Sequence, residues 1–330
     1  MAVHLLSYEV SDLCLGKPPL NPLPISATVA DALTAIKSSD YQFISVWTTA
    51  AGNAVHDRCI GKVSMVDIIF YLCKDNNLES PSSALNSPVS VLLSDVPGLV
   101  THVEASLSLM DAIDLILQGT QNLVVPIKTS SRRKLQKPLF CWLTEEDIIR
   151  FLLNSIGLFS PTPTISIDRL GIINPNFLSI DYHSLSSTSI EAFSQSLSRQ
   201  QTSVAVIDGD GILIGEISPF ILACSTGDLM DCGGPTEELV KIMRSRLKDR
   251  KLEEFVICSE TDNNGYSVRM VRSAEAIVCH PWSSLVAVMI QAIAHRVNYV
   301  WVIEEDYSLV GIVTFSSILG VFHEDLQSMV

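Results

Sequence analysis

The chain has 330 residues, 47% of them hydrophobic and 18% charged, which is enough for two domains of ordinary size and excludes global disorder. Its formal net charge of −14 argues against nucleic acid or an anionic membrane surface as the main partner. No apolar stretch is long enough to span a bilayer, because acidic and basic residues interrupt the apolar segment 139–159.

The cysteines and the first residues indicate a compartment. Eight cysteines occur without a Cys-x-x-Cys spacing or a neighbouring histidine cluster, so we interpret them as reduced thiols, not as disulfides or zinc ligands. The N-terminal residues lack the basic start and long apolar run of a signal peptide, and the Arg and Ser richness of a transit peptide. These features predict a cytoplasmic protein, with the nucleus as the alternative.

A self-similar unit occurs four times along the chain. Each unit opens with a Ser or Thr that can cap a helix, and in the first three copies an acid follows three residues later. A short strand rich in β-branched and aromatic residues begins 15 residues after each cap. The helix caps are Thr28, Ser108, Thr188 and Ser284, and the strands are 43–47, 123–127, 203–207 and 299–303.

Each unit ends with a second strand that runs into a second helix. The second caps are Ser64, Thr144, Ser218 and Thr314. The first and second caps are 36 residues apart in copies one and two and 30 apart in copies three and four, and the hairpin between the strands accounts for the difference. The hairpin turn is clearest at 208–211, Asp-Gly-Asp-Gly. With a short leading strand, each unit is predicted to be β-α-β-β-α, an α/β fold.

Composition suggests the following division of the chain: N-terminal segment 1–22, repeat 1 at 23–75, repeat 2 at 89–156, linker 157–176, repeat 3 at 177–224, a helical and loop insertion at 225–275, and repeat 4 at 276–323. The turn at 89–93 is predicted to be a short helix that begins repeat 2. Within the insertion, 237–251 is predicted to form an amphipathic helix with a basic face, which either docks an acidic partner or faces solvent.

The fourfold pattern resembles the CBS domain, the module named after cystathionine β-synthase. Four copies in phase resemble two tandem CBS pairs (Bateman modules), as in plant CBS proteins of the CBSX type, and 11–19 and 291–299 also carry that likeness. The gamma regulatory subunits of AMP-activated and sucrose-non-fermenting protein kinases are more distantly similar. The resemblance covers roughly residues 20–322. It implies repeats paired through their sheets and a disc made within one chain or by a homodimer.

The family resemblance also implies a binding site. In CBS proteins, adenosine-type ligands lie in clefts between paired repeats, and the second cap and the acid three residues later face the ribose. A carboxylate can accept hydrogen bonds from two neighbouring hydroxyls, and a helix N-terminus favours phosphate. The implied ribose-side residues are Ser64, Asp67, Thr144 and Asp147. Ser218 and Thr314 are weaker candidates, because Ile221 and Ser317 replace the acid.

Phosphate contacts are sparse in the sequence. Kinase gamma subunits place His and Arg immediately before the core strand, and none of the four corresponding positions here is basic. His295 and Arg296, just upstream in copy four, are candidates, with a solvated helix end as the alternative. A triphosphate would be poorly neutralised without such cations. The candidate ligands are therefore AMP, ADP, adenosine or S-adenosylmethionine, and no cofactor is required.

Two interpretations of the caps remain open. A hydroxyl followed three residues later by an acid is also an ordinary capping box, which contributes about 0.5–2 kcal/mol to a helix. With ligand contact, the chain is a non-enzymatic regulatory protein that binds an adenosine-containing ligand and modulates a protein kinase or another enzyme. With capping alone, it is a ligand-free scaffold that acts through protein–protein interaction. An enzyme is least favoured, because no nucleophile–base set or metal-ligand spacing is visible.

Overall fold

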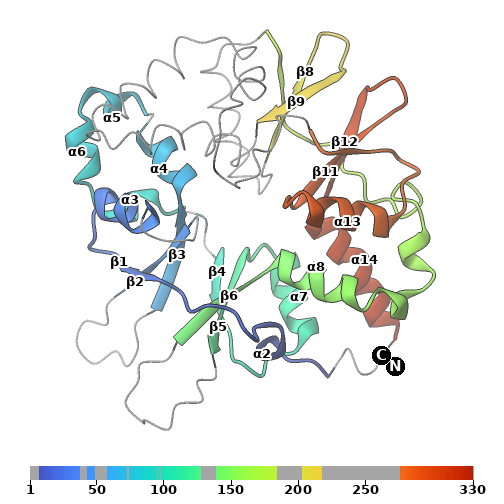
Figure 1. The fold of residues 1–330 in the computed structure, drawn as a ribbon, viewed down its shortest axis with the longest axis horizontal. Helices are drawn as coiled ribbons and strands as arrows, with labels where there is room; N and C mark the ends of the chain where they lie inside the picture. The colour runs from blue at the N-terminus through green and yellow to red at the C-terminus, as the bar shows by residue number, and fades with distance from the viewer. Residues whose placement is uncertain are drawn as a thin grey trace, which may run out of the picture.

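A computed structural model describes residues 7–37, 43–48, 58–72, 74–94, 96, 98–127, 139–183, 203–217 and 276–329. Four small sheets are arranged around a ring, so a disc forms within one chain (Figure 1). The predicted basic helix at 237–251 and the predicted cap Ser218 lie outside the described residues.

All four sheets have the same three-stranded order. A leading strand pairs in parallel with a core strand, which pairs antiparallel with the second strand of its hairpin. The strands are β1 (Pro22–Pro24), β2 (Phe43–Thr48), β3 (Arg58–Ser64), β4 (Val100–His102), β5 (Asn122–Ile127), β6 (Leu139–Thr144), β7 (Ser179–Asp181), β8 (Val204–Ile207), β9 (Leu213–Ile217), β10 (Val278–Cys279), β11 (Tyr299–Ile303) and β12 (Leu309–Thr314).

A helix begins one residue after each predicted cap that the structure describes, where the first amides lack a partner within the helix. The helices are α2 (Val10–Leu13), α3 (Val29–Lys37), α4 (Met65–Leu72), α5 (Asp75–Glu79), α6 (Pro81–Leu85), α7 (Leu109–Leu117), α8 (Glu145–Asn154), α13 (Leu285–Ala294) and α14 (Phe315–Ser328). Short 3₁₀ turns are η1 (Val89–Leu92), η2 (Ile156–Phe159) and η3 (Thr162–Thr164). Within the described part of the chain, no helix combines the length and apolarity needed to cross a membrane.

The repeats pair through their sheets. In the first pair, a buried cluster that contains Trp47, Cys59, Val124 and Trp142 joins strands of repeats 1 and 2. In the second pair, an isolated β-bridge joins Ile212 to Ser308. These contacts produce the two modules that the fourfold sequence pattern predicts.

Helices join the two pairs to each other. The largest core cluster runs through α7, α8, α13 and α14, which belong to repeats 2 and 4 (Figure 1). The rings of Phe159 and Phe322 meet edge to face within it, with centroids 4.8 Å apart. Such aromatic pairs stabilise a core beyond their buried area. Repeats 2 and 4 therefore share one hydrophobic core.

Segments that precede a repeat pack on the partner repeat. Isolated bridges join Glu9 to Ser108, Pro88 to Thr28, and Ser166 to Ser284. Fully buried Val89 accordingly lies in the core of repeat 1, and its amide donates to the carbonyl of Ala27 at 2.8 Å. The sequence assigned 89–93 to the start of repeat 2. Its side chains instead pack on the first repeat, because η1 contacts both α3 and α4.

Gly311, three residues before the cap Thr314, is required because another segment of the chain packs closely against it. At Gly311, an added Cβ would lie 2.7 Å from the backbone oxygen of Asn174. Asn174 exchanges two backbone hydrogen bonds with Ile312, at 2.9 and 3.0 Å, which fixes this close approach. In repeat 2 the same position is Cys141, and its buried thiol forms a hydrogen bond with the thiol of Cys14 from the N-terminal segment.

We predict that Gly311→Ala lowers the free energy of unfolding by about 1–3 kcal/mol, because backbone must move to admit the methyl group. Gly320→Ala is the matched control, since nothing lies within 4 Å of its added Cβ. In the interior of α14 it should leave stability unchanged or raise it by up to about 1 kcal/mol. Urea denaturation of both variants measures the difference, and equal stabilities would contradict the close-approach explanation.

Candidate functional site

A complete capping box forms where β3 runs into α4. The amide and hydroxyl of Ser64 each donate to Asp67 Oδ2 at 2.7 Å, and the amide of Asp67 donates back to Ser64 Oγ at 3.4 Å. Among the described residues, no donor bonds Asp67 Oδ1 and no cation forms an ion pair with this carboxylate. One oxygen thus closes the helix, and the other retains its capacity to accept.

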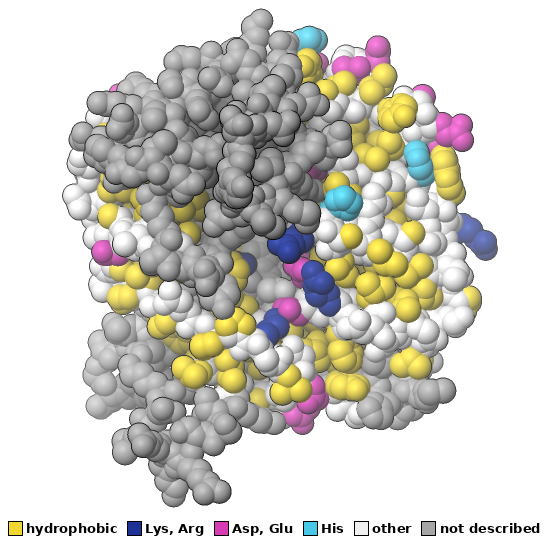
Figure 2. All heavy atoms as spheres, in the orientation of Figure 1, with side chains coloured by type: hydrophobic (Ala, Val, Ile, Leu, Met, Phe, Trp, Pro, Cys, Tyr) yellow, Lys and Arg dark blue, Asp and Glu magenta, His cyan; other side chains and the backbone are white. Residues whose placement is uncertain are grey.

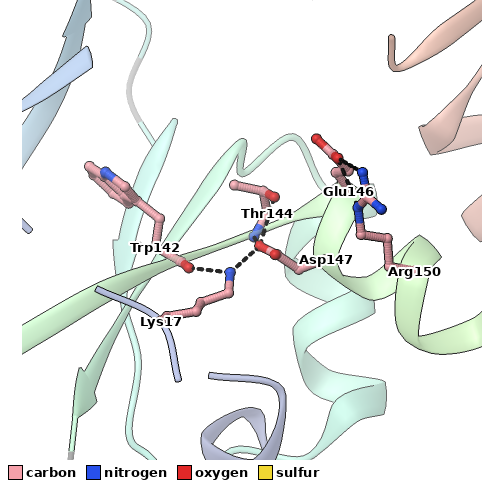
Figure 3. A network of polar contacts seen from close by, with 6 residues as sticks. All are labelled: Lys17, Trp142, Thr144, Glu146, Asp147 and Arg150. Carbon is pink, nitrogen blue, oxygen red and sulfur yellow. Dashed lines mark hydrogen bonds and ion pairs between the residues drawn. The ribbon is translucent and has the colours of Figure 1, made fainter. Parts of the chain in front are cut away.

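Repeat 2 repeats this box at the start of α8. The amide and hydroxyl of Thr144 each donate to Asp147 Oδ2 at 2.8 Å. The same oxygen forms an ion pair with Lys17, whose Nζ also donates to the carbonyl of Trp142 at 2.7 Å (Figure 3). The two capping acids of the first pair therefore have the same helix role and different charge partners.

Lys62 is a functional candidate that the sequence analysis missed. It stands two residues before Ser64 on β3, so strand alternation places both side chains on one face. Its ammonium lies 4.2 Å from the ring centroid of Phe43, and burial lowers its pKa while the carboxylates of Asp67, Asp147 and Glu146 oppose that decrease. One lysine therefore interacts electrostatically with both capping acids. In Figure 2, Lys or Arg side chains lie beside Asp or Glu side chains near the middle of the face of the molecule that is shown.

Trp142 occupies the strand position in repeat 2 that Lys62 occupies in repeat 1. Its side chain is buried at the interface of the first pair, and its Nε1–H has no hydrogen-bond partner in the described structure. A buried donor without an acceptor is costly and uncommon in native proteins. The ammonium of Lys62 likewise forms no hydrogen bond or ion pair with a described residue, so an acceptor-rich molecule could match both donors.

The first turn of α8 also touches the second pair. Burial raises the pKa of the Glu145 carboxyl, and a hydrogen bond from Ser316 at the start of α14 opposes that rise. Glu146 instead pairs with Arg150 on the surface of α8 at 2.6 Å (Figure 3). Such an exposed pair contributes about 0.3–0.5 kcal/mol. The contact between Glu145 and Ser316 thus joins α8 of the first pair to α14 of the second.

The weaker candidates that the structure describes, Thr314, His295 and Arg296, do not gather into a comparable site. Thr314 forms its box with Ser317, whose hydroxyl accepts from the Thr314 amide at 3.0 Å, so this helix start is capped without a carboxylate. His295 and Arg296 are exposed at the end of α13, where Arg296 has a φ of +56°. That geometry is typical of a residue that terminates a helix. Among the described residues, no His, Cys, Asp and Glu cluster could hold a metal ion.

A buried carboxylate fills the interface of the second pair. Glu216 is 2% exposed and stands on β9 two residues before the predicted cap, the position of Lys62 in repeat 1. Tyr299 Oη donates to its Oε1 at 2.9 Å, and Trp301 Nε1 donates to its Oε2 at 2.8 Å. Ser203 Oγ adds a long bond of 3.5 Å. The chain itself satisfies the polar groups here. Strand alternation could have indicated Glu216 as well.

Comparison with known proteins gives relatives along almost the whole chain. No family model matches. The chain is 45% identical to the CBS domain-containing protein CBSX5 of Arabidopsis thaliana, over 99% of this chain and 100% of that protein. It is 22% identical to the SNF1-related protein kinase regulatory subunit gamma-like PV42b of the same plant, over 98% and 97%. Protein MJ1225 of Methanocaldococcus jannaschii, described as a proposed archaeal homologue of the AMP-activated kinase gamma subunit, has the same fold, with a TM-score of 0.66, 15% identity and coverage of 96% and 100%.

We predict opposite pH dependences for two capping boxes in repeat 1. Burial raises the pKa of Asp67 above 3.8, so the folded state holds its proton more tightly, and the stability that Asp67 contributes is lost as pH rises from 3.8 through the raised pKa. Hydrogen bonds from Thr28 lower the pKa of Asp31, so its contribution is lost as pH falls through the lowered value. Urea denaturation of Asp67→Asn and Asp31→Asn against wild type, as a function of pH, tests this. Differences that change in the same direction would contradict it.

We predict that Glu216→Ala lowers the free energy of unfolding by about 2–5 kcal/mol, because it leaves the buried donors of Tyr299 and Trp301 without an acceptor. Glu216→Gln should cost less, since its amide oxygen still accepts from one of them. Exposed Glu305, on the neighbouring hairpin, provides the control variant Glu305→Ala, which should stay within about 0.5 kcal/mol of wild type. Denaturation midpoints that match for Glu216→Ala and the control would show that the network is not stabilising.

Proposed function

The chain belongs to the family of CBS domain-containing proteins, and we propose that it is a non-enzymatic regulatory protein. Its first pair of repeats binds an adenosine-containing ligand, and occupancy changes the activity of a partner protein, either a protein kinase or another metabolic enzyme. The full-length similarity to a kinase regulatory subunit gamma-like protein supports the regulatory role. The geometry of the first pair supports the ligand.

One observation carries the ligand proposal. Asp67 keeps one carboxylate oxygen that no described residue bonds, and Lys62 lies within its electrostatic influence. Neighbouring ribose hydroxyls donate to such an oxygen, and the α4 N-terminus favours a phosphate beside it. Ser64 and Asp67 are the proposed ribose contacts of the first half-site. Thr144 and Asp147 form the corresponding group of the second half-site.

The charge of the site favours AMP among the candidate ligands. Lys62 supplies a single ammonium in a partly buried setting, which suits one phosphate better than the several phosphates of ATP. Adenosine brings no phosphate to pair with Lys62, and the sulfonium of S-adenosylmethionine brings a second positive charge. The unpartnered Nε1–H of Trp142 adds a donor for an acceptor of the base or the phosphate. We therefore place AMP first, then ADP.

The alternative function is a ligand-free scaffold that acts through protein–protein contacts. The buried network around Glu216 favours it for the second pair, because the polar groups at that interface are matched within the chain. In the first pair, Asp67 and Lys62 favour the ligand-binding function.

We predict that AMP raises the thermal midpoint of the wild-type protein and that Asp67→Asn abolishes the rise. A ligand at 100 times its Kd adds about 2.7 kcal/mol to the stability of a protein with one site. ADP, ATP, adenosine and S-adenosylmethionine should give smaller shifts at equal concentration. Differential scanning fluorimetry of both proteins with all five compounds measures this.

Asp31→Asn is the matched control for that titration. Asp31 forms the same box with Thr28, whose amide and hydroxyl each donate to its Oδ2 at 2.8 Å, but it is exposed at the start of α3. Its variant loses a similar cap and should retain the full AMP shift. If no compound shifts the wild type, the scaffold function replaces the proposal, and if Asp31→Asn loses the shift as well, Asp67 acts only through stability.

A further inference from the structure

The segment that precedes the first repeat is anchored on the second repeat by backbone hydrogen bonds on both sides of Lys17. The amide of Val10, which is fully buried, donates to the carbonyl of Leu107 at 2.9 Å. The amide of Leu20 donates to the carbonyl of Phe140 at 2.8 Å. Lys17 lies between these anchors, so its backbone is held on both sides beside the start of α8.

The side chain of Lys17 reaches the carboxylate that caps α8 (Figure 3). Gly16, with a φ of +78°, turns the chain immediately before it through a conformation that glycine adopts at little cost. The side chains of Lys17 and Asp147 are 22% and 24% exposed, so solvent screens their attraction only in part. The ion pair is therefore positioned by the backbone on both sides of Lys17 and partly buried, unlike a pair between two extended surface side chains.

Asp147 Oδ2 consequently receives three donors, the amide and hydroxyl of Thr144 and the ammonium of Lys17. A ribose that approached Asp147 would meet a carboxylate already neutralised by its own chain. Hydrogen bonds between two charged groups are stronger than those from a neutral hydroxyl, so the ammonium is the stronger partner. Asp67 has the same helix role and no such ammonium among the described residues.

We propose that Lys17 determines which half-site of the first pair takes the ligand. It keeps Asp147 paired within the chain, and the adenosine-containing ligand binds at Asp67. This specificity role rests on the proposed function and narrows it to one ligand for each first pair. The N-terminal segment acts as an internal competitor at the second half-site.

Calorimetric titration with AMP tests the assignment through stoichiometry. The wild type should bind one AMP, lose it on Asp67→Asn and keep it on Asp147→Asn. Lys17→Met should bind two, with the second site lost again in Lys17→Met with Asp147→Asn. The site at Asp147 should bind AMP at least about tenfold more tightly in Lys17→Met than in the wild type, a ratio that corresponds to about 1.4 kcal/mol.

Two lysine variants serve as controls. Lys17→Arg keeps the cation and should keep one site, and Lys74→Met removes an exposed lysine of repeat 1 and should also keep one. Two results would overturn the assignment and leave the proposed function intact. One is a single wild-type site that is lost on Asp147→Asn, and the other is a Lys17→Met protein that still binds one AMP or binds it more weakly. Failure of every variant to bind AMP overturns the proposed function and the assignment together.

Discussion

The two donors of Ser64 both bond one oxygen of Asp67, and the functional interpretation of this protein depends on that asymmetry. A carboxylate at the third helical position closes the first turn with one oxygen and still has acceptor capacity on the other. At Asp147 the chain adds Lys17 to the oxygen that already caps the helix. At Thr314 a serine hydroxyl, that of Ser317, provides the cap in place of a carboxylate. The same backbone junction therefore carries three different chemistries, and among the described junctions the one at Asp67 has a carboxylate that forms no ion pair with an ammonium.

The arrangement of strands and helices was largely predictable, because the signals that mark it are local. A capping hydroxyl and a strand of β-branched residues act within one turn or one hairpin, so Thr28, Ser108 and Thr144 predict helix starts from their own neighbours. The exchange of leading segments was not predictable in this way. Val89 belongs to a four-residue turn, and so short a sequence does not indicate whether its side chains pack on repeat 1 or on repeat 2. That choice is made by long-range packing.

The site shows the same division between local and distant information. Asp67 and Asp147 follow from a motif, and Lys62 and Glu216 could have been found by counting back two residues along each strand to the face that the cap occupies. Lys17 had no such signal, since 125 residues separate it from the Trp142 carbonyl that it bonds. The opposite charges of Lys62 and Glu216 at equivalent positions also explain why the two pairs differ. One interface holds a cation near two acids, and the other holds an anion that Tyr299 and Trp301 already satisfy.

A regulatory role requires that binding in the first pair favours one arrangement of the molecule over another, because a ligand shifts an equilibrium only by its difference in affinity for the two states. The start of α8 contacts both pairs and is therefore a place where such a shift could be transmitted. Its first turn carries Asp147, within the influence of Lys62, and Glu145, which is bonded to Ser316 at the start of α14. Both helices lie in the core that repeats 2 and 4 share. A phosphate that pairs with Lys62 would weaken the attraction between Lys62 and the acids of α8. Because Glu145 of the same turn bonds Ser316, a shift of the first turn of α8 would also alter its contact with α14 of the second pair.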